Sequence, residues 1–257
     1  MAMTIISHCV PCERRRIAWS VTHNLKMKER ILPEIERNQI CPPADQPILE
    51  FYQGIFESVY IILHPFFKVK NKDKIDFDQD EYPNKAQITK HCIKITWKEF
   101  MILSKIKNIS KLDIALRNSI KGLKEIHNDE VTLSKLINTC EQQNVYQPNE
   151  GCFAELLIDP ILKGLADLGY KWVFRGDEFG SERKLLFIED IINNNEKIGD
   201  WYKNIFTPKK EILFSVHWDS HFTLMCSSKN TIEQFLKNEE LEGFYCDDKT
   251  EIYWSCK

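Results

Sequence analysis

EILFSVHWDSHFTLMC, residues 211–226, decides how the last third of the chain is expected to fold. Apolar side chains alternate with other residues on both sides of Asp219 and Ser220, which is typical of two strands joined by a tight turn. Such a hairpin would place Trp218 opposite His221. The stretch therefore predicts an antiparallel pair of strands at the centre of this part of the chain.

The predicted hairpin sorts its side chains onto two faces, because neighbouring residues of a strand point in opposite directions. One face would carry Phe214, Val216, Trp218, His221, Thr223 and Met225. The other would carry Ser215, His217, Phe222, Leu224 and Cys226. Since both faces are largely apolar, we expect helices to cover both, the middle helices on one side and a helix at 231–241 on the other.

The two histidines and the aspartate of this stretch have a second interpretation. In an uninterrupted strand, His217, Asp219 and His221 would project from one face and could bind Zn²⁺ or Fe²⁺. In the hairpin, the two histidines point to opposite faces and share no metal. We favour the hairpin, so no cofactor is predicted, and a divalent metal at these three residues is the alternative.

Composition divides the chain into a basic arm at residues 1–41 and one domain at residues 42–257. Arg and Lys are in excess in the arm segments CERRRIAW and LKMKERILPEIER. The segment ICPPADQP (40–47) follows, and its prolines favour an extended linker. We predict that the arm is helical or partly disordered and that its removal leaves the rest folded.

Helical spacing of apolar residues dominates the middle of the chain, whereas the C-terminal part alternates with the period of strands. Thr96 and Glu99 have the capping-box spacing that starts a helix. Helices are predicted at about 97–106, 112–126, 132–143, 151–170 and 230–241, and strands at 59–64, at 170–174, in the 211–226 hairpin and in a second hairpin around Asp248 and Lys249. The predicted fold class is therefore α+β, a helical middle region packed on a C-terminal antiparallel sheet with a β-β-α-β-β ending.

Five segments of the domain together resemble an uncharacterised bacterial family. They are YIILHPFF, ITWKEF, LDIALRNSIKGLKE, GYKWVFRGDEFGSERK and VHWDSHFTLMCSSK. The family is a domain of unknown function found in Bacillus-type organisms, and the resemblance covers about residues 45–257. It implies no activity, so functional expectations rest on the residues themselves.

RGDEFGSERK (175–184) gathers carboxylates and arginines after a predicted strand, where loops present polar side chains. We hypothesise that His221 meets a carboxylate of this loop in a polar cleft at the end of the sheet. The alternative is a solvated turn whose charges pair with one another. The candidate partners of His221 are Asp177, Glu178 and Glu182. Candidates for catalysis are Glu178, Glu182, His217 and His221, and candidates for ligand binding are Arg175, Asp177, Glu178, Arg183, Trp218 and His221.

Charge and hydropathy exclude two classes of partner. The formal net charge is −3 with acidic and basic residues interspersed, so no nucleic-acid partner is expected. The longest apolar stretch, residues 58–67, is too short to cross a bilayer, so no membrane partner is expected either. Nine widely spaced cysteines are unlike a secreted disulfide framework, and we expect a cytoplasmic protein.

The common enzyme motifs are missing: there is no glycine-rich phosphate loop, no serine-hydrolase elbow and no zincin helix. We therefore expect a non-catalytic binding or regulatory protein whose partner is another protein or a small polar ligand. One alternative is a metal-dependent or acid–base hydrolase that uses the same residues. A second alternative is a thiol redox protein, because Cys9 and Cys12 have the Cys-x-x-Cys spacing.

Overall fold

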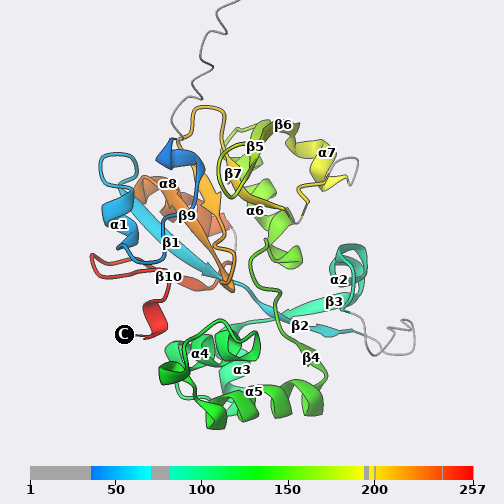
Figure 1. The fold of residues 1–257 in the computed structure, drawn as a ribbon. Coiled ribbons are helices and arrows are strands. Elements are labelled where there is room, and N and C mark those ends of the chain that lie inside the picture. Colours follow the sequence, from blue (N-terminus) through cyan, green and yellow to red (C-terminus); the bar gives the residue numbers. More distant parts are fainter. Residues whose placement is uncertain (1–35, 71–81, 194–196, 200, 239, 257) are drawn as a thin grey trace, which may run out of the picture. The chain divides into compact units, whose positions relative to one another are not determined.

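The computed structural model describes residues 36–70, 82–193, 197–199, 201–238 and 240–256 (Figure 1). Predictions for residues 1–35, including Cys9 and Cys12, lie outside the described residues. Helices and antiparallel sheets both contribute to the fold, so the predicted α+β class is confirmed. Within the described part of the chain, no helix is long and apolar enough to cross a membrane.

A seven-stranded antiparallel sheet has the order β10-β1-β9-β8-β7-β5-β6. Its strands are β1 (Ser58–Leu63), β5 (Trp172–Asp177), β6 (Arg183–Phe187), β7 (Tyr202–Phe206), β8 (Leu213–Ser215), β9 (Phe222–Ser227) and β10 (Gly243–Tyr245). A second sheet has three strands, β3 (Cys92–Ile95), β2 (Phe66–Val69) and β4 (Val145–Tyr146), in that order. Strands far apart in sequence are therefore neighbours in this sheet, as where β1 pairs with β9.

The predicted hairpin is present as β8 and β9, and its register is confirmed. Phe214 pairs with Met225 and Ser215 with Leu224, which is the register that would bring residues 218 and 221 opposite each other. Pairing stops at Ser215, however, and residues 216–221 form a wider connection than the predicted two-residue turn. The tight turn is therefore wrong, because Asp219 turns into the protein instead of capping the hairpin.

Eight α-helices and three short 3-10 helices occupy the described part of the chain. The α-helices are α1 (Ile48–Phe51), α2 (Lys85–His91), α3 (Trp97–Ser104), α4 (Ile109–Ser119), α5 (Glu130–Gln143), α6 (Glu155–Asp167), α7 (Ile188–Ile192) and α8 (Lys229–Asn238). The 3-10 helices are η1 (Arg37–Gln39), η3 (Glu125–His127) and η4 (Trp254–Cys256). The capping box of α3 is confirmed, since Thr96 and Glu99 exchange side-chain and backbone hydrogen bonds.

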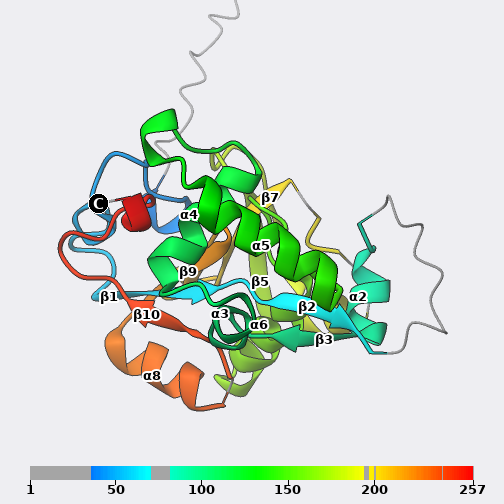
Figure 2. The same cartoon turned by 90° about the horizontal axis from the view of Figure 1, so that it is seen from below.

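Both faces of the large sheet are covered, as predicted, and each has its own apolar core. The first core joins Phe214, Val216 and Met225 to residues of α6, α7 and α8. The second core joins alternate strand residues, among them Leu224 and Cys226, to α1, α3, α4 and α5. Figure 2 shows α4 and α5 on one side of the strands and α8 on the other.

Two details of the predicted faces are wrong. Trp218 does not share the face of the first core but is 57% exposed at the tip of the connection. Helix α6 covers the same face as α8, although it was expected with the other middle helices on the opposite face. The physical reason is the stripe of apolar residues along α6, which faces the first core together with Phe235 of α8.

The predicted β-β-α-β-β ending is correct up to its last strand. Gly243–Tyr245 forms β10, but it pairs with β1 instead of with the residues after Asp248. The final segment instead turns at Asp247–Thr250 and ends in η4. Ile252 is fully buried in the second core, so this segment is held by packing on helices and not by a strand partner.

Residues 36–41 belong to the packed part of the protein. Gln39 is buried and accepts a hydrogen bond from Arg183 at 3.0 Å, and the carbonyl of Ile40 accepts one from Tyr52 at 2.7 Å. The boundary between arm and domain at residue 41 stays a prediction. A chain shortened at that position would lose the contacts of Gln39 and Ile40.

Candidate functional site

The candidate site is built around the 216–221 connection, and its foundation is an ion pair inside α4. Asp113 and Arg117 are one helical turn apart, and Arg117 Nε lies 2.7 Å from Asp113 Oδ2. Both side chains are 0% exposed. A buried guanidinium needs hydrogen-bond acceptors around it, so its other partners decide what it holds in place.

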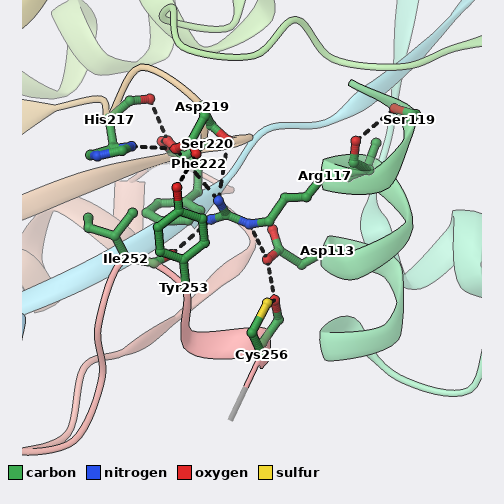
Figure 3. Close-up of polar contacts among 12 residues, drawn as sticks. Asp113, Arg117, Ser119, His217, Asp219, Ser220, Phe222, Ile252, Tyr253 and Cys256 are labelled. Carbon is green, nitrogen blue, oxygen red and sulfur yellow. Dashed lines mark hydrogen bonds and ion pairs between the residues drawn. The ribbon is translucent and has the colours of Figure 1, made fainter. Parts of the chain in front are cut away.

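Arg117 reaches from α4 to the connection and to the C-terminal segment (Figure 3). It donates to the carbonyls of Asp219 at 3.3 Å and Ile252 at 2.8 Å, and Nη1 lies 3.6 Å from Asp219 Oδ1. The guanidinium carbon is also 4.7 Å from the ring centroid of Tyr253, a cation–π distance. One side chain thus joins α4, the connection and the last described residues.

Asp219 is the second charge of this network and is 2% exposed. Its Oδ1 lies 2.5 Å from Nδ1 of His217, and its Oδ2 accepts a hydrogen bond from the hydroxyl of Tyr253 (Figure 3). Burial alone would raise the pKa of Asp219, but the hydrogen bonds from His217 and Tyr253 and the charge of Arg117 hold it below its usual value. Asp219 is therefore an ionised acceptor.

An ionised Asp219 fixes the imidazole of His217. A carboxylate only accepts, so Nδ1 of His217 must carry the proton and donate it. Nε2 of His217 is then the nitrogen left for acid–base chemistry, but among the described residues no serine, threonine or cysteine side chain hydrogen-bonds to its imidazole, since the hydroxyl of Ser220 donates to the backbone carbonyl of His217.

His221 lies at the other end of the connection and is 1% exposed. Its carbonyl accepts the backbone N–H of His64 at 2.9 Å, and Nε2 of His64 lies 2.8 Å from the hydroxyl of Thr223. Burial lowers the pKa of both histidines to about 3, so both are neutral at pH 7. Within the described residues, neither Nδ1 atom has a hydrogen-bond partner.

A cavity of about 330 Å³ opens beside His221. Its lining consists of Tyr82, Ser119, Ile120, Cys140, Val145, Tyr146, Gln147, Pro148, Asn149, Glu150 and His221. A larger cavity of about 680 Å³ shares Tyr82 and Asn149 with it and carries Lys85, Glu155 and Lys197. Only the smaller cavity is lined by a buried side chain whose polar atom lacks a partner in the described part of the chain.

The predicted 175–183 loop is the β5–β6 hairpin, and its polar groups are used in local contacts. Arg175 donates to the carbonyl of Ile198 at 2.8 Å and lies over the ring of Tyr202 at 4.0 Å. Asp177 accepts the backbone N–H of Glu182 at 2.9 Å. The loop and the 216–221 connection do lie at the same end of the sheet, as predicted, because β5, β7 and β8 are successive neighbours there.

The predicted pair between His221 and a carboxylate of that loop does not form. No hydrogen bond or ion pair joins His221 to Asp177, Glu178 or Glu182 in the described structure. The charged side chains that affect the pKa of His221 are Arg117, which lowers it, and Asp219, which raises it. The physical reason is that Asp219 turns inward toward Arg117 of α4. The carboxylate beside the connection is therefore Asp219, whereas the hypothesis expected one from the 175–183 loop. Arg183 is occupied with Gln39, and Trp218 extends beside the ring of His217 at 5.5 Å.

The metal alternative at His217, Asp219 and His221 finds no support in the geometry. His217 and Asp219 are hydrogen-bonded to each other, and His221 faces the cavity. No group of three or more His, Cys, Asp or Glu side chains within the described ranges has an arrangement that could hold a metal ion.

Three residues of the site escaped sequence reasoning: Asp113, Arg117 and Tyr253. The first two are the charged residues of LDIALRN, four positions apart, and they fall on the apolar face of a helix. A charged pair on an apolar face predicts a buried ion pair, so this signal was available. Tyr253 had none, because its role depends on where the chain returns after β10.

The fold and this connection define an α+β protein with a buried polar network at one end of an antiparallel sheet. The chain belongs to the family described as a protein of unknown function (DUF2711), whose model matches residues 44–256. It is 22% identical over 216 residues to the uncharacterised protein YwbB of Bacillus subtilis (strain 168). The aligned region covers 82% of this chain and 95% of YwbB. No solved structure matches the chain. The resemblance to an uncharacterised Bacillus-type family is confirmed.

Proposed function

We propose that this protein is a non-catalytic binding protein whose ligand, a small polar molecule, occupies the cavity beside His221. The observation that carries the proposal is the buried imidazole of His221, which lines that cavity and whose Nδ1 has no hydrogen-bond partner in the described structure. Leaving such a group unsatisfied costs about 1–3 kcal/mol, which a ligand that bonds to it recovers. The volume of about 330 Å³ lies at the lower end of the range typical of ligand sites.

The surroundings support a preformed site. Arg117 and Asp219 hold the 216–221 connection from one side, and the backbone N–H of Gly151 donates to the carbonyl of Ser220 at 2.9 Å from the other. A side chain at Gly151 would meet the carbonyl oxygen of Trp218 at 2.0 Å, so the two segments are in direct backbone contact. A site built on such fixed elements loses little conformational entropy on binding.

The proposal is tested by ligand-induced stabilisation. We expect thermal shifts with some members of a panel of small amines, alcohols, amides, carboxylates, sugars and nucleosides, because a ligand at 100 times its Kd stabilises the folded state by about 2.7 kcal/mol. His221→Phe, which removes the nitrogen and fills space, should abolish these shifts while the variant remains folded. If no compound stabilises the protein, or if His221→Phe responds like the natural chain, the cavity is not a ligand site.

The hydrogen bond of 2.5 Å between His217 and Asp219 favours a second candidate, an acid–base enzyme. A carboxylate that orients an imidazole is the arrangement by which a histidine acts as general base. The test is hydrolysis of p-nitrophenyl acetate and p-nitrophenyl phosphate by the natural chain and by His217→Gln. A rate that is equal in the two proteins, or no rate above buffer, removes this candidate.

A cytoplasmic location accompanies the proposal. All seven cysteines in the described ranges are free thiols, which is typical of a reducing compartment. With a net charge of −3 we propose no nucleic-acid partner.

A further inference from the structure

The aromatic side chains of the cavity beside His221 form a corner. The rings of Tyr82 and Tyr146 are 6.5 Å apart and nearly perpendicular, at 87°. Tyr146 is stacked on Phe67 with a centroid distance of 5.1 Å, and the hydroxyl of Tyr82 donates to the carbonyl of Gln147 at 3.2 Å. Both rings are therefore held in position, and a tyrosine face that borders the cavity would offer negative quadrupole potential to a bound group.

The charge of the described lining has one sign. Among the described residues, Glu150 is the single acidic residue of the lining, and neither lysine nor arginine is part of it. Glu150 is exposed and has no ion-pair partner in the described part of the chain. His221 adds a neutral imidazole whose Nδ1 accepts a hydrogen bond when the proton is on Nε2.

We propose that the cavity beside His221 binds a small organic ammonium ion, with the charged group between the tyrosine faces and Glu150 and an N–H donated to Nδ1 of His221. This inference rests on the proposed function, since it names the ligand class of the same site. An ammonium group has three donors and no acceptor, which matches a lining of acceptors and aromatic faces.

Other ligand classes fit this lining less well. A phosphate or carboxylate would find no cation among the described residues of the lining and would meet the charge of Glu150. A neutral alcohol could bond to His221 but would gain nothing from the tyrosine faces beyond burial. The larger cavity, with Lys85 and Lys197, is the one whose lining could accept an anion.

Three probes of similar size and different charge separate these classes: propylammonium, 1-propanol and propionate. We expect calorimetric titration of the full chain at pH 7 to give the smallest Kd for propylammonium, roughly tenfold below that of 1-propanol, with propionate the weakest. Added salt should weaken propylammonium binding and leave 1-propanol unchanged.

Two variants assign the contacts. Glu150→Gln should raise the Kd of propylammonium roughly fivefold and leave that of 1-propanol unchanged, with Glu125→Gln, an exposed acid outside the lining, as the matched control. Tyr146→Leu should also raise the Kd of propylammonium severalfold, whereas Tyr146→Phe keeps the ring and should not.

The outcomes distinguish the inference from the proposed function. If 1-propanol or propionate binds most tightly, or if no probe binds while another compound of the panel binds in a way that His221→Phe abolishes, the ammonium inference is wrong and the proposed function stands. If nothing in the panel or the series binds, both fail. Equal effects of Glu150→Gln and Glu125→Gln on propylammonium would also overturn the inference.

Discussion

Removal of the buried guanidinium of Arg117 is the most direct test of the network beneath the connection. Arg117→Met keeps an unbranched apolar stem but deletes the guanidinium, whose charge lies 2.7 Å from Asp113 and 3.6 Å from Asp219. Breaking a buried ion pair by removing one partner costs about 3–5 kcal/mol, because the other charge is left uncompensated. That is a large part of the roughly 5–15 kcal/mol that stabilises a typical domain.

The magnitude is measured by urea unfolding followed by circular dichroism. A loss of 3–5 kcal/mol corresponds to a fall in Tm of roughly 6–20 °C for a chain of this size. The matched control is Lys111→Met in the same helix, where the ion pair with Asp129 is 49% exposed on the lysine side and should contribute no more than about 1 kcal/mol.

A double variant tests whether an uncompensated carboxylate causes the loss of stability in Arg117→Met. Asp113→Asn combined with Arg117→Met removes one of the two uncompensated carboxylates, so its cost should be at least about 1 kcal/mol below the sum of the two single costs. Strict additivity, or a cost of Arg117→Met no larger than that of Lys111→Met, would refute the reasoning that this network fixes the connection.

Three further outcomes are expected. His64 and His221 have pKa values lowered to about 3, so the unfolded state binds more protons than the folded state below pH 6.5. The free energy of unfolding should therefore fall by roughly 2–4 kcal/mol between pH 7 and pH 5, and by about half as much in His221→Phe. An unchanged pH dependence of this variant in urea titrations would contradict the prediction. Gly151→Ala should cost roughly 2–4 kcal/mol in the same titrations, because φ is +62° and the new Cβ would lie 2.0 Å from a backbone oxygen; a cost under 1 kcal/mol would show that the contact relaxes. A chain that begins at Pro42 should still unfold cooperatively with a Tm only a few degrees lower, and loss of the transition in calorimetry would show that the arm belongs to the core.

Features of the fold that depend on residues close in sequence could be predicted, whereas features that depend on contacts between distant residues could not. The register of β8 and β9 was predictable, since alternation places Phe214 and Leu224 on opposite faces whatever else the protein does. The turn was not, because Asp219 points inward only when Arg117, 102 residues earlier in the chain, is there to receive it. The second hairpin failed for a related reason, since β10 pairs with β1 near the start of the domain, where Tyr60 lies opposite Tyr245.

The candidate site was predicted in part. His217 and His221 were named because their residue types carry chemistry, and both lie at the connection. The acidic loop was proposed as the partner of His221 because it was the nearest concentration of charge that the sequence displays. Sequence distance does not measure proximity in a sheet whose neighbouring strands β1 and β9 come from opposite ends of the domain. Asp219, which contacts His217, was assigned to the turn.

The interior strand β1 alternates between the two cores, with Tyr60 and Ile62 in the first and Val59, Ile61 and Leu63 in the second. Neither helical layer can therefore detach without exposing one side of a strand that the other layer still holds. Opening of one core should propagate to the other, so the amides of β1 and β9 are expected to exchange with deuterium only through global unfolding. The protein would then have a single cooperative unit centred on this strand, although its helices lie in two layers.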